Sequence, residues 1–164
     1  MRNRLTAPVV QSIGERTGGE ALRTIRQTVP IEAAVGFGFY GGHFVSVATS
    51  DGVSINFAFD VASQGGLYVV LVVVLLVASG YDAATAAGVN PRPSERALAG
   101  ASIVAGYLPP AVAGAFVFEW STTGGFGGDP VTFSLPLATS ALLAGVAFPV
   151  ALGGIGGLVA SRLA

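Results

Sequence analysis

His43 is the residue whose chemistry stands out, because it is the only histidine of the chain and lies within a long apolar segment. Between Ile31 and Ser50 the one charged residue is Glu32, at the start of the segment. An ionisable side chain inside a membrane segment is by default a candidate functional residue. A helix would carry Glu32 and His43 on nearly the same face, about 16 Å apart along its axis. That face could line a path for protons or ions.

A second interpretation gives His43 a structural role. The ring would be neutral and hydrogen-bonded to a neighbouring hydroxyl or carbonyl group, while Glu32 would lie in the headgroup region. We prefer this interpretation, because one histidine and one carboxylate at the end of a segment are few ionisable groups for an ion pathway.

Depth along the predicted helices indicates which side chains could accompany His43. This residue lies about 10 Å from the outer end of its predicted helix. The same depth corresponds to Tyr68 in the second hydrophobic segment and to Thr139 and Ser140 in the last. In the third segment it lies one helical turn from Tyr107. These side chains would form a polar cluster if the helix faces that carry them meet.

The sequence offers few of the residues that an enzyme active site needs. One histidine, no cysteine and no second carboxylate within a hydrophobic segment leave too few ligands for a metal site. A serine hydrolase needs serine and histidine in contact, but Ser79 lies about 17 Å deeper than His43, and no third group is evident beside Ser140. The glycine-rich run at 124–128 lacks the lysine of a phosphate-binding loop. The sequence therefore predicts no catalytic residue, no metal site and no cofactor.

The composition is that of a membrane protein. The 164-residue chain is 52% hydrophobic and only 10% charged, with a mean hydropathy of +0.70. Soluble domains carry about 25% charged residues, so this chain cannot cover a water-facing surface. A net charge of -1 implies no bulk attraction to nucleic acid. We predict one membrane domain and an all-α fold, with the lipid bilayer as the principal partner.

Four segments are candidates for transmembrane helices, at about residues 31–50, 61–81, 97–118 and 134–161. The second contains no charged residue, and as a helix it would be roughly 31 Å long, which matches the hydrocarbon thickness of a bilayer. The first is weaker, because it contains Gly36, Gly38, Gly41, Gly42 and His43. Together they predict a four-helix membrane bundle over residues 31–164.

The basic residues decide how this bundle is threaded. All 8 are arginines, at positions 2, 4, 16, 23, 26, 92, 96 and 162. Four spans place all of them on one side, with Asp51, Asp60, Glu119 and Asp129 on the other. Three spans, without residues 31–50, would separate the first five from the last three. Since arginine collects in cytoplasmic loops, the distribution favours four spans in the cell membrane, with both termini cytoplasmic.

Residues 1–30 carry five of these arginines and no apolar core typical of a signal peptide. Apolar residues recur in this segment at helical spacing on both sides of Gly18 and Gly19. One interpretation is a pair of basic amphipathic helices on the membrane surface. The other is a partly ordered tail whose arginines only set the topology, and the sequence leaves both open.

Prolines and small residues predict how the helices bend and pack. Pro109 and Pro110 deprive the Ala105 and Gly106 carbonyls of their helical donors, so we expect a kink there and another at Pro149. Such carbonyls could also bind an ion, although a bend is the commoner outcome. Small residues form one face of the last helix and, more weakly, of the first. They include Gly145, Gly153, Gly156 and Gly157, and Gly38 and Gly42. Such faces let another helix approach closely, and that helix could belong to a second copy of the chain.

The segment FPVALGGIGG at 148–157, together with Gly80 and Tyr81, resembles small multi-spanning membrane proteins of halophilic archaea. The similarity covers about the last two-thirds of the chain, and the absence of lysine fits the same source. The resemblance implies a membrane location and brings no substrate or catalytic residue with it.

These observations favour a non-enzymatic structural or accessory membrane subunit that packs against copies of itself or another membrane protein. The alternative is a small oligomeric transporter or pore for protons, ions or a small solute, with His43 and the third helix at its centre. The two hypotheses differ in what His43→Ala removes, since only a transporter would lose flux while still inserting normally.

Overall fold

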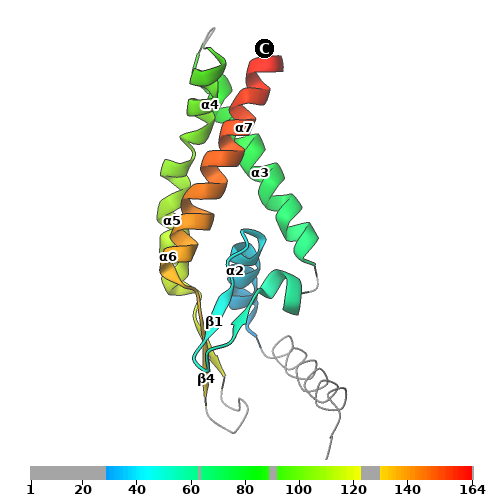
Figure 1. Ribbon diagram of the computed structural model, residues 1–164, viewed down its shortest axis with the longest axis vertical. Coiled ribbons are helices and arrows are strands. Elements are labelled where there is room, and N and C mark those ends of the chain that lie inside the picture. The colour runs from blue at the N-terminus through cyan, green and yellow to red at the C-terminus, as the bar shows by residue number, and fades with distance from the viewer. Residues whose placement is uncertain (1–28, 63, 89–91, 123–129, 164) are drawn as a thin grey trace, which may run out of the picture.

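Long helices dominate the computed structural model, which describes residues 29–62, 64–88, 92–122 and 130–163. They are α3 (Gly65–Ala86), α4 (Pro93–Ala101) followed by α5 (Val104–Val117), and a continuous run of α6 (Leu137–Thr139), the π-helix η2 (Ser140–Ala147) and α7 (Phe148–Leu163) (Figure 1). Within the described residues, three helices of 22, 25 and 27 residues are long and apolar enough to cross a membrane. The shortest would be roughly 33 Å long.

The segment 31–50 is not a fourth long helix, so the prediction of a four-helix bundle is wrong at this point. Its helix α2 (Ile31–Gly42) has 12 residues, and the chain then turns and enters strand β1 (Val47–Thr49). Twelve residues rise about 18 Å, which is too short to cross a bilayer. Hydropathy left this segment ambiguous, because valine is as hydrophobic in a strand as in a helix. The arginine distribution then favoured a fourth span, but the placement of charges says nothing about how the apolar residues between them fold.

A specific backbone motif ends α2. The N–H of Phe44 donates to the Gly41 carbonyl, and the N–H of Val45 donates to the Tyr40 carbonyl. This pair of bonds is the Schellman arrangement, which needs a left-handed residue directly after the helix cap. Phe44 has that conformation, with φ 60°, although glycine is the usual residue there. The motif pairs the last carbonyls of α2, so the helix can end inside the protein.

A small antiparallel sheet lies at one end of the long helices, so the prediction of an all-α fold is wrong in this part. The sheet has 4 strands in the order β2-β1-β4-β3. They are β1, β2 (Ser54–Ile55), β3 (Trp120–Thr122) and β4 (Val131–Ser134). Ala48 pairs with Ser134, which joins the two halves of the chain. Such long-range pairing leaves no local hydropathy signal, and the fold is mostly helical with a small sheet.

The long helices differ in place from the predicted segments. Helix α3, which corresponds to the predicted segment 61–81, begins at Gly65, after the one-turn π-helix η1 (Phe57–Val61), and continues past Tyr81 to Ala86. Asp82 marks the end of the charge-free stretch but is compatible with helix, because its side chain is exposed. The last helix begins at Leu137, three residues after the predicted start. Charge therefore located the apolar core of each helix better than its ends.

The long helices meet at one end and separate at the other. Figure 1 shows α7 beside α3 and α4 near the C-terminus, while α3 diverges from α7 toward the sheet. The helix α2 lies in the space between them, in the half of the molecule next to the sheet. Its start packs near Phe133 of β4, and its last turn reaches Ala111 of α5. A short helix and its returning strand thus fill the gap that the long helices leave.

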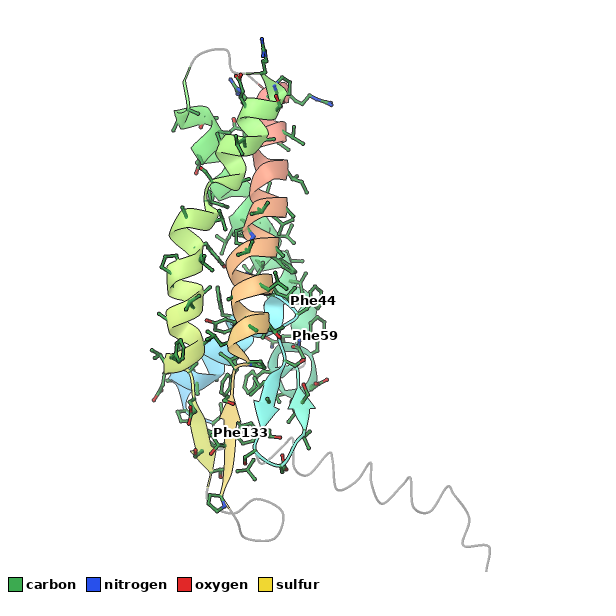
Figure 2. All side chains as sticks on the ribbon, turned by 60° about the vertical axis from the view of Figure 1, so that its left-hand side comes forward. Phe44, Phe59 and Phe133 are labelled. Atoms are coloured by element: carbon green, nitrogen blue, oxygen red, sulfur yellow. The ribbon has the colours of Figure 1, made fainter. Side chains whose placement is uncertain are left out.

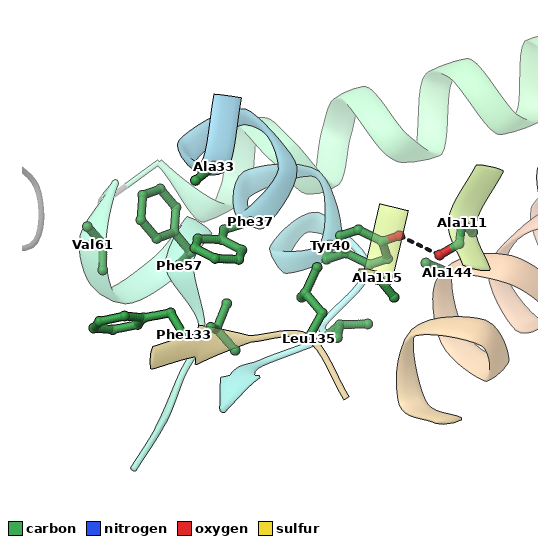
Figure 3. Close-up of a cluster of buried hydrophobic side chains, with 12 residues drawn as sticks. Ala33, Phe37, Tyr40, Phe57, Val61, Ala111, Ala115, Phe133, Leu135 and Ala144 are labelled. Carbon is green, nitrogen blue, oxygen red and sulfur yellow. Dashed lines mark hydrogen bonds between the residues drawn. The ribbon is translucent and has the colours of Figure 1, made fainter. Parts of the chain in front are cut away.

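A cluster of buried side chains fixes α2 in this position (Figure 3). Phe37 is 1% exposed, and its ring centroid lies 5.8 Å from that of Phe57 in η1. Tyr40 is fully buried, and its hydroxyl donates to the Ala111 carbonyl of α5. Strand β4 contributes Phe133, whose ring stacks on Trp120 at 4.9 Å. The cluster joins α2, the sheet and α5 into one unit.

Candidate functional site

His43 is the residue at the C-terminal cap of α2, and it is fully buried. Its Nδ1 lies 2.8 Å from the Phe39 carbonyl oxygen, and its Nε2 lies 3.2 Å from the Tyr107 hydroxyl. Because a carbonyl can only accept, Nδ1 carries the proton of the neutral ring. Nε2 then accepts from the Tyr107 hydroxyl of α5. The two bonds fix both the tautomer and the orientation of the ring.

Aromatic rings surround the imidazole. Its centroid lies 4.7 Å from Phe39 on α2, 5.2 Å from Phe148 on α7 and 5.8 Å from Tyr107. Phe44, the next residue, is half-exposed and stacks on Phe59 (Figure 2). A polar pair is thus enclosed by aromatic side chains where α2, α5 and α7 approach one another.

The imidazole of His43 and the hydroxyl of Tyr107 together have the parts for holding a proton. Within the described residues no group of three or more histidine, cysteine, aspartate or glutamate side chains could hold a metal ion. A cavity of about 10 Å³ lies elsewhere, beside the sheet, and its lining is apolar, from Val29, Phe37, Val47, Ile55, Phe57, Val61 and Phe133. This volume is at the lower limit for one water molecule, which an apolar lining would not bind.

Of the predicted companions of His43, Tyr107 is the one that the structure joins to it. Tyr68 packs on another side of α2, where an added Cβ at Gly38 would lie 2.7 Å from its ring. Thr139 is exposed, and Ser140 is buried with no partner for its hydroxyl in the described part of the chain. Glu32 is exposed at the start of α2. Matching depth placed Tyr68, Thr139 and Ser140 in the layer of His43 but could not say which helix faces meet.

The proline pair does not interrupt its helix. Pro109 and Pro110 lie inside α5, which continues through them, and the break between α4 and α5 is earlier, at Ser102 and Ile103. Ala105 and Gly106 lie on the exposed side, so the carbonyls considered for ion binding do not belong to the His43 site. The break in this helix therefore lies about two turns before the pair, and a bend at the prolines themselves stays a prediction.

Pro149 is accommodated by a wider helix. It follows η2, in which hydrogen bonds span five residues, and the N–H of Phe148 donates to the Leu143 carbonyl. A π-helical turn makes room for the proline ring, which would otherwise clash with the preceding turn. The long last helix thereby remains continuous.

The small-residue faces lie against other helices of the same chain. An added Cβ at Gly153 would come within 2.8 Å of Ile103, and one at Gly156 within 2.7 Å of the Tyr81 nitrogen. At Gly157 it would collide with the Arg96 backbone, and at Gly145 it would lie 2.6 Å from Leu108. On α2, an added Cβ at Gly42 would meet Tyr68 at 3.2 Å. Helices α3, α4 and α5 of the same chain therefore cover the glycine faces that were predicted to contact a second copy of the chain.

Charged residues gather at the two ends of the helices. Arg92, Arg96 and Arg162 lie at the end that carries the C-terminus, where Arg96 Nη1 donates to the Ala160 carbonyl at 2.7 Å and caps α7. At the sheet end the Thr49 hydroxyl donates to the exposed Asp51 carboxylate and holds the pKa of that carboxyl below its usual value. The five N-terminal arginines, which were predicted to lie on the cytoplasmic side, fall outside the described residues.

Comparison with known proteins gives a family and no activity. A model of DUF7978, a family of unknown function, matches residues 5–164. No curated protein matches the chain. No solved structure matches it either.

Proposed function

This chain belongs to the DUF7978 family, and we propose that it is an integral membrane protein with a non-enzymatic, structural or accessory role. The observation that carries the proposal is the packing of the described helices. The long apolar helices are in backbone contact at their glycines, and α2 fills the remaining space with aromatic side chains. Such an interior supports a rigid bilayer-embedded body better than a substrate chamber.

The partner of this body would contact its outward-facing side chains. Large apolar residues of α3 and α7 are exposed, among them Leu71, Val74, Leu75 and Leu158. In a bilayer these side chains face lipid, a second copy of the chain or another membrane protein. The glycines of α7 are unsuited to that contact, because helices of the same chain already cover them.

A flux measurement tests the structural role. Purified protein is reconstituted into liposomes that contain a pH-sensitive dye, and a pH gradient or a potassium diffusion potential is applied. We expect the rate of dye response to equal that of protein-free liposomes. Flux that is present in the wild type and lost in His43→Gln, with equal reconstitution, would contradict the structural role and favour the transporter.

The arginines orient the body in the membrane. On the described arginines, we place the end with Arg92, Arg96 and Arg162 in the cytoplasm, since basic residues collect on that side. The sheet then lies outside, together with the start of α2, because this helix enters from the sheet end and returns to it. The C-terminus stays on the cytoplasmic side, as the charge pattern predicts, whereas residue 29 lies on the opposite side. The five arginines at positions 2 to 26 precede residue 29 at the other end, and an orientation set by them would be the reverse.

Cysteine labelling tests this orientation, since the chain has no cysteine of its own. Glu32→Cys, Ser54→Cys and Ser94→Cys each add one exposed thiol, and intact cells are treated with a membrane-impermeant maleimide. We expect labelling at positions 32 and 54, and labelling at position 94 only after permeabilisation. Opposite accessibility of positions 32 and 54 would show that residues 31–50 cross the membrane after all. The cysteine-free wild type is the background control.

A further inference from the structure

We propose that His43 is a proton-binding site built into the tip of α2, and that its protonation reverses the hydrogen bond between His43 and Tyr107. The tip means here His43 and Phe44, where the helix ends and the chain turns back. The proposal rests on the geometry of this pair and is independent of the structural role proposed above.

The hydrogen bonds of the neutral ring leave one place for a proton. Nδ1–H donates to the Phe39 carbonyl at 2.8 Å, so the free lone pair is that of Nε2. The only partner of Nε2 among the described residues is the Tyr107 hydroxyl at 3.2 Å. When Nε2 takes up a proton from the medium, it becomes a donor. The Tyr107 oxygen must then accept, and its own hydrogen, which stays on the oxygen, must rotate away.

Burial of the ring among aromatic side chains favours its neutral form, and three features act in the opposite direction. The Phe39 carbonyl accepts from Nδ1 in both states, and a charged donor strengthens that bond. The negative end of the α2 dipole lies at its C-terminal cap, where a histidinium is stabilised. The centroids of Phe39 and Phe148 lie at 4.7 Å and 5.2 Å, within the range of cation–π attraction.

The surroundings contain no described carboxylate or arginine in contact with the ring. α5 contributes Tyr107, α7 contributes the apolar Phe148, and α2 itself contributes Tyr40, whose hydroxyl is engaged with Ala111. Tyr68 of α3 packs behind Gly42. Tyrosines in their neutral form do not compete for the proton at ordinary pH. His43 is therefore the group in this part of the described chain that changes charge.

Nitrogen NMR tests the proposal without any substitution. The full chain, without a polyhistidine tag, is labelled with ¹⁵N-histidine and placed in lipid nanodiscs, so every histidine signal comes from His43. We expect a neutral ring protonated at Nδ1 at high pH, and protonation of Nε2 as the pH is lowered while the protein stays folded. A neutral ring protonated at Nε2, or one that never titrates before unfolding, would overturn the proposal.

Two variants test the role of Tyr107. Tyr107→Phe removes the hydroxyl, and we expect it to shift the titration midpoint of His43 by about half a pH unit or more, because the hydroxyl bonds differently to the two protonation states. Tyr68→Phe is the matched control, since Tyr68 contacts α2 at Gly38 and not at the imidazole. It should leave the midpoint unchanged. An unchanged midpoint in Tyr107→Phe, or an equal shift in both variants, would refute the assigned bond reversal.

Discussion

Gly156→Ala is expected to prevent stable packing of the long helices. The added methyl group would collide with the Val77 carbonyl oxygen and lie 2.7 Å from the Tyr81 nitrogen. Both obstacles are backbone atoms of α3, so no side-chain rotation can relieve the clash, and the two helices must move apart. Overpacking of this kind costs about 3 kcal/mol, a large part of the stability of a domain of this size.

Thermal unfolding in detergent, followed by size-exclusion chromatography of the heated samples, measures this effect. The control is Gly154→Ala, two residues away on the same helix, where the added Cβ has its nearest neighbour at 3.7 Å. That contact is an ordinary one, so the control should keep the wild-type midpoint or exceed it slightly, because alanine favours helix. Equal behaviour of the two variants would mean that α3 and α7 are not in backbone contact.

Phe37→Ala is expected to detach α2 from the rest of the protein. The Phe37 ring is buried between η1 and the sheet, and its removal leaves a cavity lined by Phe57, Val61 and Phe133 (Figure 3). Truncation of a buried phenylalanine typically costs about 3–5 kcal/mol, through lost contacts and the cavity that remains. Because α2 is too short to cross the membrane, it has no stable place once these contacts are lost.

Limited proteolysis, combined with thermal unfolding, separates local detachment from global unfolding. We expect Phe37→Ala to be cleaved within residues 31–56 under conditions in which the long helices remain intact. Phe116→Ala provides the comparison, because Phe116 lies on α5 and is 66% exposed. Its truncation removes surface without opening a cavity, so it should unfold within about 0.5 kcal/mol of the wild type. Cleavage of Phe116→Ala at the same positions would contradict the packing of α2.

Local composition was sufficient to predict the long helices. Each contains a long apolar stretch, and hydropathy is a property of neighbouring residues, so the segments at 61–81, 97–118 and 134–161 overlap the observed helices. Residues 31–50 could not be divided in the same way. Val45 and Val47 are hydrophobic in either conformation. Val45 belongs to the turn that ends α2, whereas the strand that begins at Val47 is held partly by pairing far along the chain, between Ala48 and Ser134.

The sequence was sufficient to predict the level of the site residues along the helix axes but not which way each helix faces. Helical rise placed His43 and Tyr107 near the same level, and the structure puts the tyrosine hydroxyl 3.2 Å from the imidazole. The same arithmetic selected Tyr68 and Thr139, which lie elsewhere, because the rotation of one helix against another depends on packing across the whole interface. The glycines of α7 likewise indicate close approach without saying which helix approaches.

The shortness of α2 bears on how the protein is made. Residues 31–49 leave the ribosome before α3, α5 and α7, yet in the finished molecule they are enclosed by those helices. The twelve-residue helix is too short to span the bilayer, and strand β1 has no partner on one edge until β4 has been made, so the segment cannot wait in the bilayer alone. In the membrane location proposed above, we therefore expect the segment to remain at the membrane surface during synthesis and to enter after the last helix has been inserted. Its entry would then be the final step of biogenesis, and it could occur only in a chain that had been translated to the end.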